Sequence, residues 1–119
     1  MGQSMGQALI VEDDPMLQRL LAELIEEMGY SVTSTEDAEK ARKAIHDREF
    51  QFLLTDLKLQ GDRAAGLALA NEIRTENAYM QIVIVSGYPM PDDLPPETLF
   101  LQKPFTILQL QSLIQAPPN

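Results

Sequence analysis

The stretch Phe52-Leu53-Leu54-Thr55-Asp56 is an apolar run that ends in a carboxylate, and it predicts a buried strand with a chemically active end. A charged side chain costs free energy to bury and rarely ends a core strand by accident. Three similar apolar runs end in Glu12-Asp13-Asp14, in Ser86 and in Lys103-Pro104. If the four runs are parallel strands, their polar ends meet at one edge of the sheet, where open α/β folds bind ligands.

Segments of helical period separate the apolar runs, and this alternation predicts an α/β fold. Apolar residues recur at helical spacing between Leu17 and Met28, with Asp14 as an N-cap and Pro15 as a first helical residue. Shorter helices are expected near 38–45 and 67–73, and strands at 7–11, 30–34, 50–55, 82–86 and 99–102. The order of these elements predicts a three-layer, doubly wound sheet of five parallel strands with helices on both faces.

The segment between the fourth and fifth strands interrupts this pattern. It holds four prolines, Pro89, Pro91, Pro95 and Pro96, and proline disrupts the interior of a helix. The fourth helix of the alternation is therefore expected to be absent or very short, about one turn at most. A last helix should begin near Thr106 and Gln109, which have capping-box spacing, and end at Pro117-Pro118. We expect one domain over 7–116, with tails at 1–6 and 117–119.

The composition excludes several classes of protein. The chain has 119 residues, a net charge of −9 and no cysteine. The lack of cysteine excludes disulfides and thiolate metal sites and fits a cytoplasmic protein. The acidic charge and the lack of a basic recognition helix argue against direct nucleic-acid binding. No apolar stretch approaches the roughly 20 residues of a membrane helix, so no membrane insertion is expected.

Asp13 and Asp56 are expected to project from the same edge of the sheet, with Glu12 beside them. Carboxylates this close repel one another, and one would take up a proton unless a cation intervenes. Mg²⁺ fits such a site, since it prefers oxygen ligands and often bridges to phosphate. A single histidine and no cysteine make zinc or copper a poor alternative. The other interpretation is that these acids cap helices or end strands, which is the role expected of Asp14.

Lys103 and Ser86 add a cation and a hydroxyl group to the same edge. The Lys103 ammonium group would pair with Asp56 or with an anion attached to it. Ser86 alone is weak evidence, because serine often ends a strand. Together the acids, the hydroxyl group and the amine predict a phosphoryl-transfer site in which Asp56 is the nucleophile and forms an aspartyl phosphate.

With these motifs the chain resembles a response-regulator receiver domain of two-component signalling, across about residues 7–115. The matching segments are Leu9–Pro15, Leu53–Leu59, Val83–Gly87 and Phe100–Phe105. The resemblance implies a flavodoxin-like sheet in the strand order 2-1-3-4-5. It also implies that a histidine kinase or a histidine phosphotransfer protein donates a phosphoryl group from phosphohistidine to Asp56, with Mg²⁺ as the cofactor. Such a domain relays the signal by conformational change or onward phosphotransfer, and it is not an enzyme in the usual sense.

The same resemblance implies a role for each group at the edge of the sheet. Asp13 and Asp56 would bind Mg²⁺ directly, and Glu12 would assist. Lys58 would contribute its backbone carbonyl to the metal, which leaves its side chain free. Lys103 would pair with the phosphoryl group after transfer.

Ser86 would hydrogen-bond the phosphoryl oxygens, and Phe100 holds the position of the family's switch aromatic, whose rotamer follows Ser86. Four features depart from the family pattern, and the largest is the segment 87–98, where the family usually has a full helix. Glu12 replaces a commoner aspartate, Gln60 stands where proline is frequent, and the late Gly66 lengthens the loop after the third strand. The segment after Ser86 is similar to receivers of hybrid sensor kinases or to single-domain regulators, and the oligomeric state stays open.

Two other functions are compatible with the sequence. One is a pseudo-receiver that binds partners without phosphorylation, although the groups that such domains tend to lose are all present. The other is a Mg²⁺-dependent phosphohydrolase with an aspartate nucleophile, although Lys58 stands where such enzymes have a second aspartate. Tyr88 could gate the site or be an ordinary loop aromatic, and Arg63 is expected only to lead into the third helix.

Overall fold

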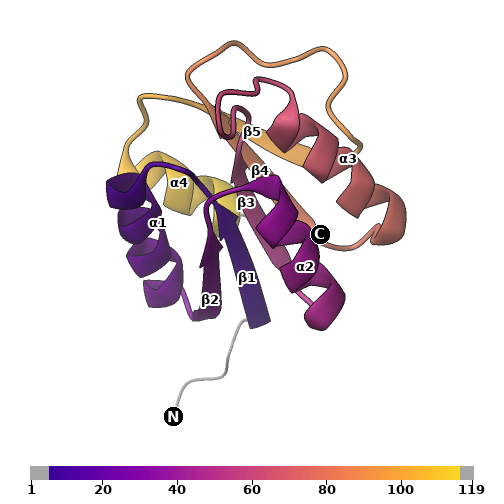
Figure 1. Cartoon of the computed structure of the whole chain (residues 1–119). Helices are drawn as coiled ribbons and strands as arrows, with labels where there is room; N and C mark the ends of the chain where they lie inside the picture. Colours follow the sequence, from indigo (N-terminus) through magenta and orange to yellow (C-terminus); the bar gives the residue numbers. More distant parts are fainter. Residues whose placement is uncertain (1–5, 116–119) are drawn as a thin grey trace.

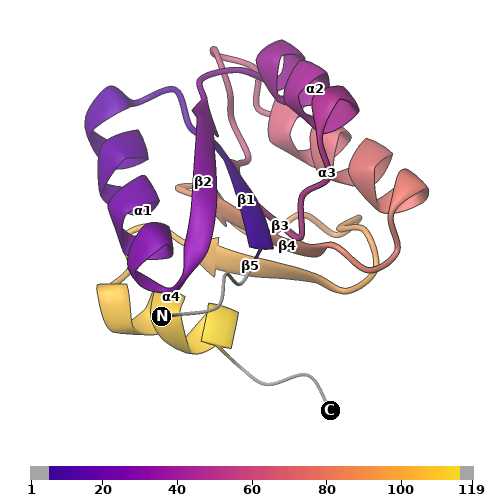
Figure 2. The same ribbon diagram turned by 90° about the horizontal axis from the view of Figure 1, so that it is seen from below.

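The computed structural model describes residues 6–115 and shows one sheet of five parallel strands in the order β2-β1-β3-β4-β5. The strands are β1 (Gly6–Val11), β2 (Tyr30–Thr35), β3 (Phe52–Asp56), β4 (Gln81–Ser86) and β5 (Thr98–Gln102). The helices are α1 (Pro15–Glu27), α2 (Ala38–Asp47), α3 (Ala65–Glu76) and α4 (Ile107–Gln115). Helices α1 and α4 cover one face of the sheet, and α2 and α3 cover the other (Figure 1, Figure 2). The three-layer fold and the strand order predicted from the sequence are confirmed.

Apart from Gly6, which begins β1, the expected tails lie outside the described residues, and so does the expected end of the last helix at Pro117-Pro118. None of the helices in the described part is long and apolar enough to cross a membrane.

The core consists of two apolar layers, one on each side of the sheet. Side chains alternate between the faces of a strand, so each central strand contributes to both layers. The layer under α2 and α3 contains Leu9, Val11, Leu53, Ile82 and Ile84. The layer under α1 and α4 contains Ala8, Ile10, Phe52, Leu54, Val83 and Val85. All of these side chains are fully buried, and each large one contributes about 1.5–3 kcal/mol, so the central strands form a rigid base for their ends.

Local signals fix where two of the helices begin. The Asp14 carboxylate accepts hydrogen bonds from the backbone N–H of Met16 at 3.0 Å and of Leu17 at 3.4 Å, so it caps α1 as predicted. The predicted capping box precedes α4. The N–H of Gln109 donates to Thr106 Oγ1 at 3.0 Å, and the N–H of Thr106 donates to Gln109 Oε1 at 2.7 Å.

No helix lies between β4 and β5 in the described chain, which confirms the expectation from the prolines. The connection runs past α3 as an open loop (Figure 1). Two features hold it: Leu94 and Pro95 pack inward, and the Arg74 guanidinium of α3 donates hydrogen bonds to the carbonyls of Pro96 at 2.9 Å and Glu97 at 3.2 Å. The loop therefore has a defined path although it lacks regular secondary structure.

Candidate acceptor site

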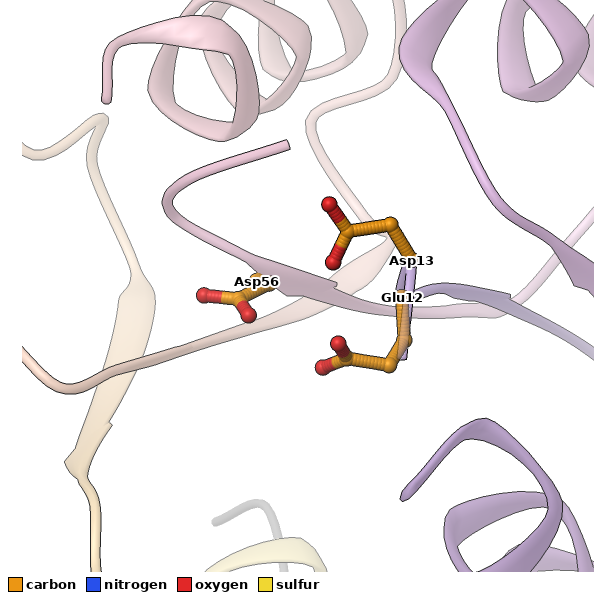
Figure 3. Close-up of side chains that lie close together, drawn as sticks. All are labelled: Glu12, Asp13 and Asp56. Atoms are coloured by element: carbon orange, nitrogen blue, oxygen red, sulfur yellow. The ribbon is translucent and has the colours of Figure 1, made fainter. Parts of the chain in front are cut away.

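The predicted groups do meet at one edge of the sheet. Asp56 ends β3 and Ser86 ends β4, and the register pairs Asp56 with Val85 and Ser86 with Gln102, directly before Lys103. Glu12 and Asp13 follow the last residue of β1. Figure 3 shows the side chains of Glu12, Asp13 and Asp56 close together at the ends of two neighbouring strands. One oxygen from each lies within 4.8 Å of the others.

Glu12 is the most deeply buried of these acids, with a side chain that is only 1% exposed. Its Oε2 accepts a hydrogen bond from the N–H of Asp14 at 3.0 Å. Its Oε1 is buried and has no hydrogen-bond partner among the described residues. Burial raises the pKa of Glu12 to about 7; the hydrogen bond from Asp14 opposes this rise, and the negative charge of Asp56 adds to it.

Lys103 provides the positive charge of the site. Its Nζ lies 2.8 Å from Asp56 Oδ2 and 3.6 Å from Glu12 Oε1. Burial works against the charged amine, but the hydrogen bond to Asp56 and the charge of Glu12 more than offset it, so the pKa of Lys103 is raised above its usual value. The backbone N–H of Lys103 donates to the carbonyl of Ser86 at 2.7 Å, which fixes the amine beside the end of β4.

The donor set fits a hard divalent cation. Three carboxylates gather at one point, and a buried oxygen of Glu12 lacks a hydrogen-bond partner among residues 6–115. Such an oxygen is costly unless a cation or a proton meets it. Asp13 is exposed and accepts a hydrogen bond from the N–H of Gln60 at 2.9 Å, while the N–H of Lys58 lies 3.4 Å from Asp56 Oδ1. The chain thus places Lys58 next to the Asp56 carboxylate, with its side chain exposed.

Ser86 is fully buried, and its Oγ accepts a hydrogen bond from the N–H of Tyr88 at 2.8 Å. Tyr88 and Phe100 are both half-buried against the core layer under α2 and α3. The guanidinium carbon of Arg63 lies 4.3 Å from the centroid of the Tyr88 ring. The expectation that Arg63 only leads into α3 was therefore incomplete. The sequence marks Tyr88 by its position after Ser86, but no pattern in it indicates the partner of that ring.

The loop after β3 folds back on the end of that strand. Leu59 and Asp62 exchange two backbone hydrogen bonds, at 2.9 and 3.0 Å, across a turn that contains Gly61 with a φ of 81°. The N–H of Gly66 then donates to the carbonyl of Leu57 at 2.9 Å. A Cβ atom at Gly66 would overlap the carbonyl oxygen of Asp56. Glycine is therefore required where α3 begins, because that backbone touches the backbone of Asp56.

Comparison with known proteins identifies the family. A family model described as the response regulator receiver domain matches residues 8–115. The chain belongs to this family. Receiver domains are modules of two-component signalling, interact in general with histidine kinases or phosphotransfer proteins, and bind Mg²⁺ through acidic residues. They are signalling modules and not enzymes in the usual sense.

Particular relatives show how far the likeness extends. This receiver domain is similar to the nitrogen assimilation regulatory protein NtrX of Azorhizobium caulinodans, at 36% identity over 80 residues that cover 67% of this chain and 18% of that protein. The chain thus spans only a small part of that relative. A CheY-like receiver domain from Methylobacillus flagellatus has a TM-score of 0.76 and 30% identity, and the match covers 95% of this chain and 98% of that one. The response regulator TrrA of Thermotoga maritima, in complex with Mg²⁺-BeF, has a TM-score of 0.81 and 26% identity over 94% of this chain and 98% of that one.

Proposed function

We propose that this receiver domain accepts a phosphoryl group on Asp56 from the phosphohistidine of a histidine kinase or a histidine phosphotransfer protein. The observation that carries the proposal is the position of Asp56, at the end of a fully buried strand, 2.8 Å from the Lys103 amine and beside two further carboxylates. A carboxylate held in this way is oriented for attack, and cationic groups around it stabilise negative charge on a transferring phosphoryl group.

In the transfer step, an oxygen of Asp56 forms a bond to phosphorus as the bond between phosphorus and the imidazole nitrogen breaks. The imidazole leaves with the bonding electron pair and takes up a proton from solvent. Lys103 then exchanges part of its ion pair with Asp56 for the phosphoryl oxygens, which it can reach without leaving the site. Ser86 donates a hydrogen bond to the same group, because its Oγ already accepts one from Tyr88 and keeps its own hydrogen for donation.

Asp13, Asp56, Glu12 and the backbone carbonyl of Lys58 would hold Mg²⁺. When bound, the ion supplies positive charge that neutralises the phosphoryl oxygens. The roles of Ser86 and Phe100 as a switch follow from the same assignment. Phe100 lies half-buried on the core layer that Tyr88 also contacts, so a displacement of Ser86 can reach both rings through their shared packing.

The donor is expected to dock on an apolar groove next to the acceptor. The groove has a volume of about 330 Å³ and runs between α1 and the start of α4, with Lys103 at its rim and an apolar lining of Leu17, Leu20, Leu21, Leu24, Phe105 and Ile107. Met16 and Leu108, which adjoin the lining residues Leu17 and Ile107 in sequence, are also exposed. A helical protein that presents a phosphohistidine would cover these side chains and bring its phosphoryl group to Asp56.

Intact-mass measurement with a small phosphodonor, acetyl phosphate, tests the proposal. In the presence of Mg²⁺ the wild-type chain should gain the mass of one phosphoryl group, and a chelator should prevent this. Asp56→Asn should gain none. The matched control Asp47→Asn removes an exposed acid at the end of α2 and should react like wild type. A wild-type chain that takes up no phosphoryl group would favour a pseudo-receiver, and an adduct that persists in Asp56→Asn would place the acceptor elsewhere.

A further inference from the structure

Two loops flank the acceptor carboxylate, and a single cation–π contact joins them. Arg63 lies in the loop between β3 and α3, and Tyr88 lies in the loop between β4 and β5. The guanidinium carbon of Arg63 is 4.3 Å from the centroid of the Tyr88 ring, well inside the range in which the ring quadrupole attracts a cation. The Tyr88 side chain also packs against the core layer under α2 and α3. The ring is thus held both by the core and by a cation.

Tyr88 is also connected to the acceptor site through its backbone. Its N–H donates to Ser86 Oγ at 2.8 Å, and this bond leaves the serine hydrogen free for donation to another group. Gly87, the residue between them, is exposed, and a side chain there would meet open space. Gly87 has no side chain to fix the turn, so the hydrogen bond from the Tyr88 N–H to Ser86 Oγ links the orientation of the serine hydroxyl group to the position of Tyr88.

The contact between Arg63 and Tyr88 matters because the described chain has no helix between β4 and β5 to hold this loop. The far end of the loop is fixed by Arg74, which donates to the carbonyls of Pro96 and Glu97. The near end, beside Ser86, has no helix to hold it in the described chain, and Met90 is exposed. The contact with Arg63 adds to the core packing of Tyr88 and fixes the ring at this end.

We propose that Arg63 is a positioning residue for phosphoryl uptake at Asp56. It holds the Tyr88 ring, the Tyr88 N–H orients the Ser86 hydroxyl group, and that group meets an oxygen of the incoming phosphoryl group. This inference rests on the proposed function. With acetyl phosphate as the donor, an Asp56 oxygen forms a bond to phosphorus, the bond from phosphorus to the acetyl oxygen breaks, and acetate leaves with the electron pair. Ser86 donates a hydrogen bond throughout and keeps its proton.

The experiment measures the rate of acyl phosphate formation from acetyl phosphate and Mg²⁺ in the full chain. Arg63→Ala should slow the reaction by about two- to fivefold, the factor expected for an exposed cation–π contact. Arg63→Lys keeps a cation over the ring and Tyr88→Phe keeps the ring, so both should stay within twofold of wild type, a margin of about 0.4 kcal/mol. Arg42→Ala is the matched control, because it removes the same charge from an exposed pair with Glu72 on α2 and α3. It should react like wild type.

A double-mutant cycle with Tyr88→Leu separates positioning from simple attraction of an anionic donor. If Arg63 acts through the ring, Arg63→Ala has no further effect on the rate in the Tyr88→Leu background. If the full loss persists there, or if Arg63→Ala reacts like Arg42→Ala, the inference is overturned while the proposed function stands. If the wild type takes up no phosphoryl group, both fail together. The amide NMR signal of Tyr88 gives an independent readout: it should shift in folded Arg63→Ala and stay unchanged in Arg42→Ala.

Discussion

Glu12 carries a carboxyl group that is buried away from solvent. Its side chain is almost fully buried, and one of its oxygens has no hydrogen-bond partner among the described residues. The site tolerates this group because Lys103 lies nearby and because the carboxyl group can hold a proton up to about pH 7. A bound cation would remove the same penalty when the group is ionised.

The stability of the metal-free domain should therefore fall as the pH rises. Glu12 ionises near its ordinary pKa of 4.5 in the unfolded chain and near 7 in the folded domain. The stabilisation that comes from proton binding at Glu12 is fully present below the lower pKa. It is lost as the pH rises to the upper pKa, which lowers the free energy of unfolding by on the order of 2–3 kcal/mol. Glu12→Gln should abolish this loss. Urea denaturation of the wild type and Glu12→Gln, in a chelating buffer at about pH 5 and about pH 8, measures this loss of stability. An equal dependence on pH in the two proteins would contradict the prediction.

Gly66 is the second residue whose identity is dictated by a contact. A Cβ at this position would overlap the Asp56 carbonyl oxygen, so Gly66→Ala should lose about 1–3 kcal/mol of stability, or more if the backbone cannot yield. Gly87→Ala is the control, since its Cβ would meet open space and the change should stay within about 0.5 kcal/mol. Urea denaturation of the two variants measures the difference. Equal losses of stability in the two variants would show that the start of α3 does not touch the Asp56 backbone.

At the scale of elements, Arg74 holds the loop between β4 and β5, where the described chain has no helix. Its guanidinium donates to four backbone carbonyls, those of Asn77 and Ala78 at the end of α3 and those of Pro96 and Glu97 in the loop before β5. This set of bonds holds a proline-rich loop on the sheet without regular secondary structure. Four backbone carbonyl groups thereby share one charged donor group that ties α3 to the loop.

Arg74→Ala should lower the stability by about 1–3 kcal/mol and increase hydrogen exchange in 94–98, because charged hydrogen bonds are lost from a half-buried site. Arg42→Ala should cost only about 0.2–1 kcal/mol, since it breaks an exposed ion pair. Urea denaturation and hydrogen exchange of both variants provide the comparison. If hydrogen exchange in 94–98 became faster in Arg42→Ala and stayed unchanged in Arg74→Ala, Arg74 would not be the residue that holds this loop.

The elements were predictable from the sequence where local chemistry decides them. Apolar runs on central strands, the Asp14 cap and the Thr106 capping box are local signals, and each matched the structure. The convergence of Glu12, Asp13, Asp56 and Lys103 followed from strand parity and the parallel topology. The contacts of Arg63 and Arg74 were not predictable. They join loops distant in sequence, and no periodicity marks which guanidinium group will meet which ring or carbonyl.

At the scale of the whole molecule, the two faces of the sheet differ in what they offer a partner. The α1 and α4 side carries the apolar groove that opens beside Lys103, and Leu20 on its rim is 51% exposed. Under the proposed function, this apolar surface next to Asp56 would allow a partner to gain binding free energy as it delivers its phosphoryl group. The chain's acidic surface, with a net charge of −9, disfavours partners that are themselves strongly acidic.

Leu20→Glu should reduce phosphotransfer from a phosphorylated histidine phosphotransfer protein by about tenfold, because it places a charge in the docking groove. The rate with acetyl phosphate, which needs no groove, should stay unchanged. Tyr79→Glu is the control, since Tyr79 is 96% exposed and lies beyond the other end of the sheet, between α3 and β4. A loss in Tyr79→Glu equal to that in Leu20→Glu would show that the groove is not the docking surface.

The proposed function depends most on which atom receives the phosphoryl group. The most direct measurement treats the wild-type chain with acetyl phosphate and Mg²⁺, traps the acyl phosphate by borohydride reduction, and locates the altered residue by peptide mass spectrometry. We expect the change at Asp56 alone, and none when Mg²⁺ is chelated. A change at Asp13, Glu12 or any other residue in place of Asp56, or no change at all, would contradict the account.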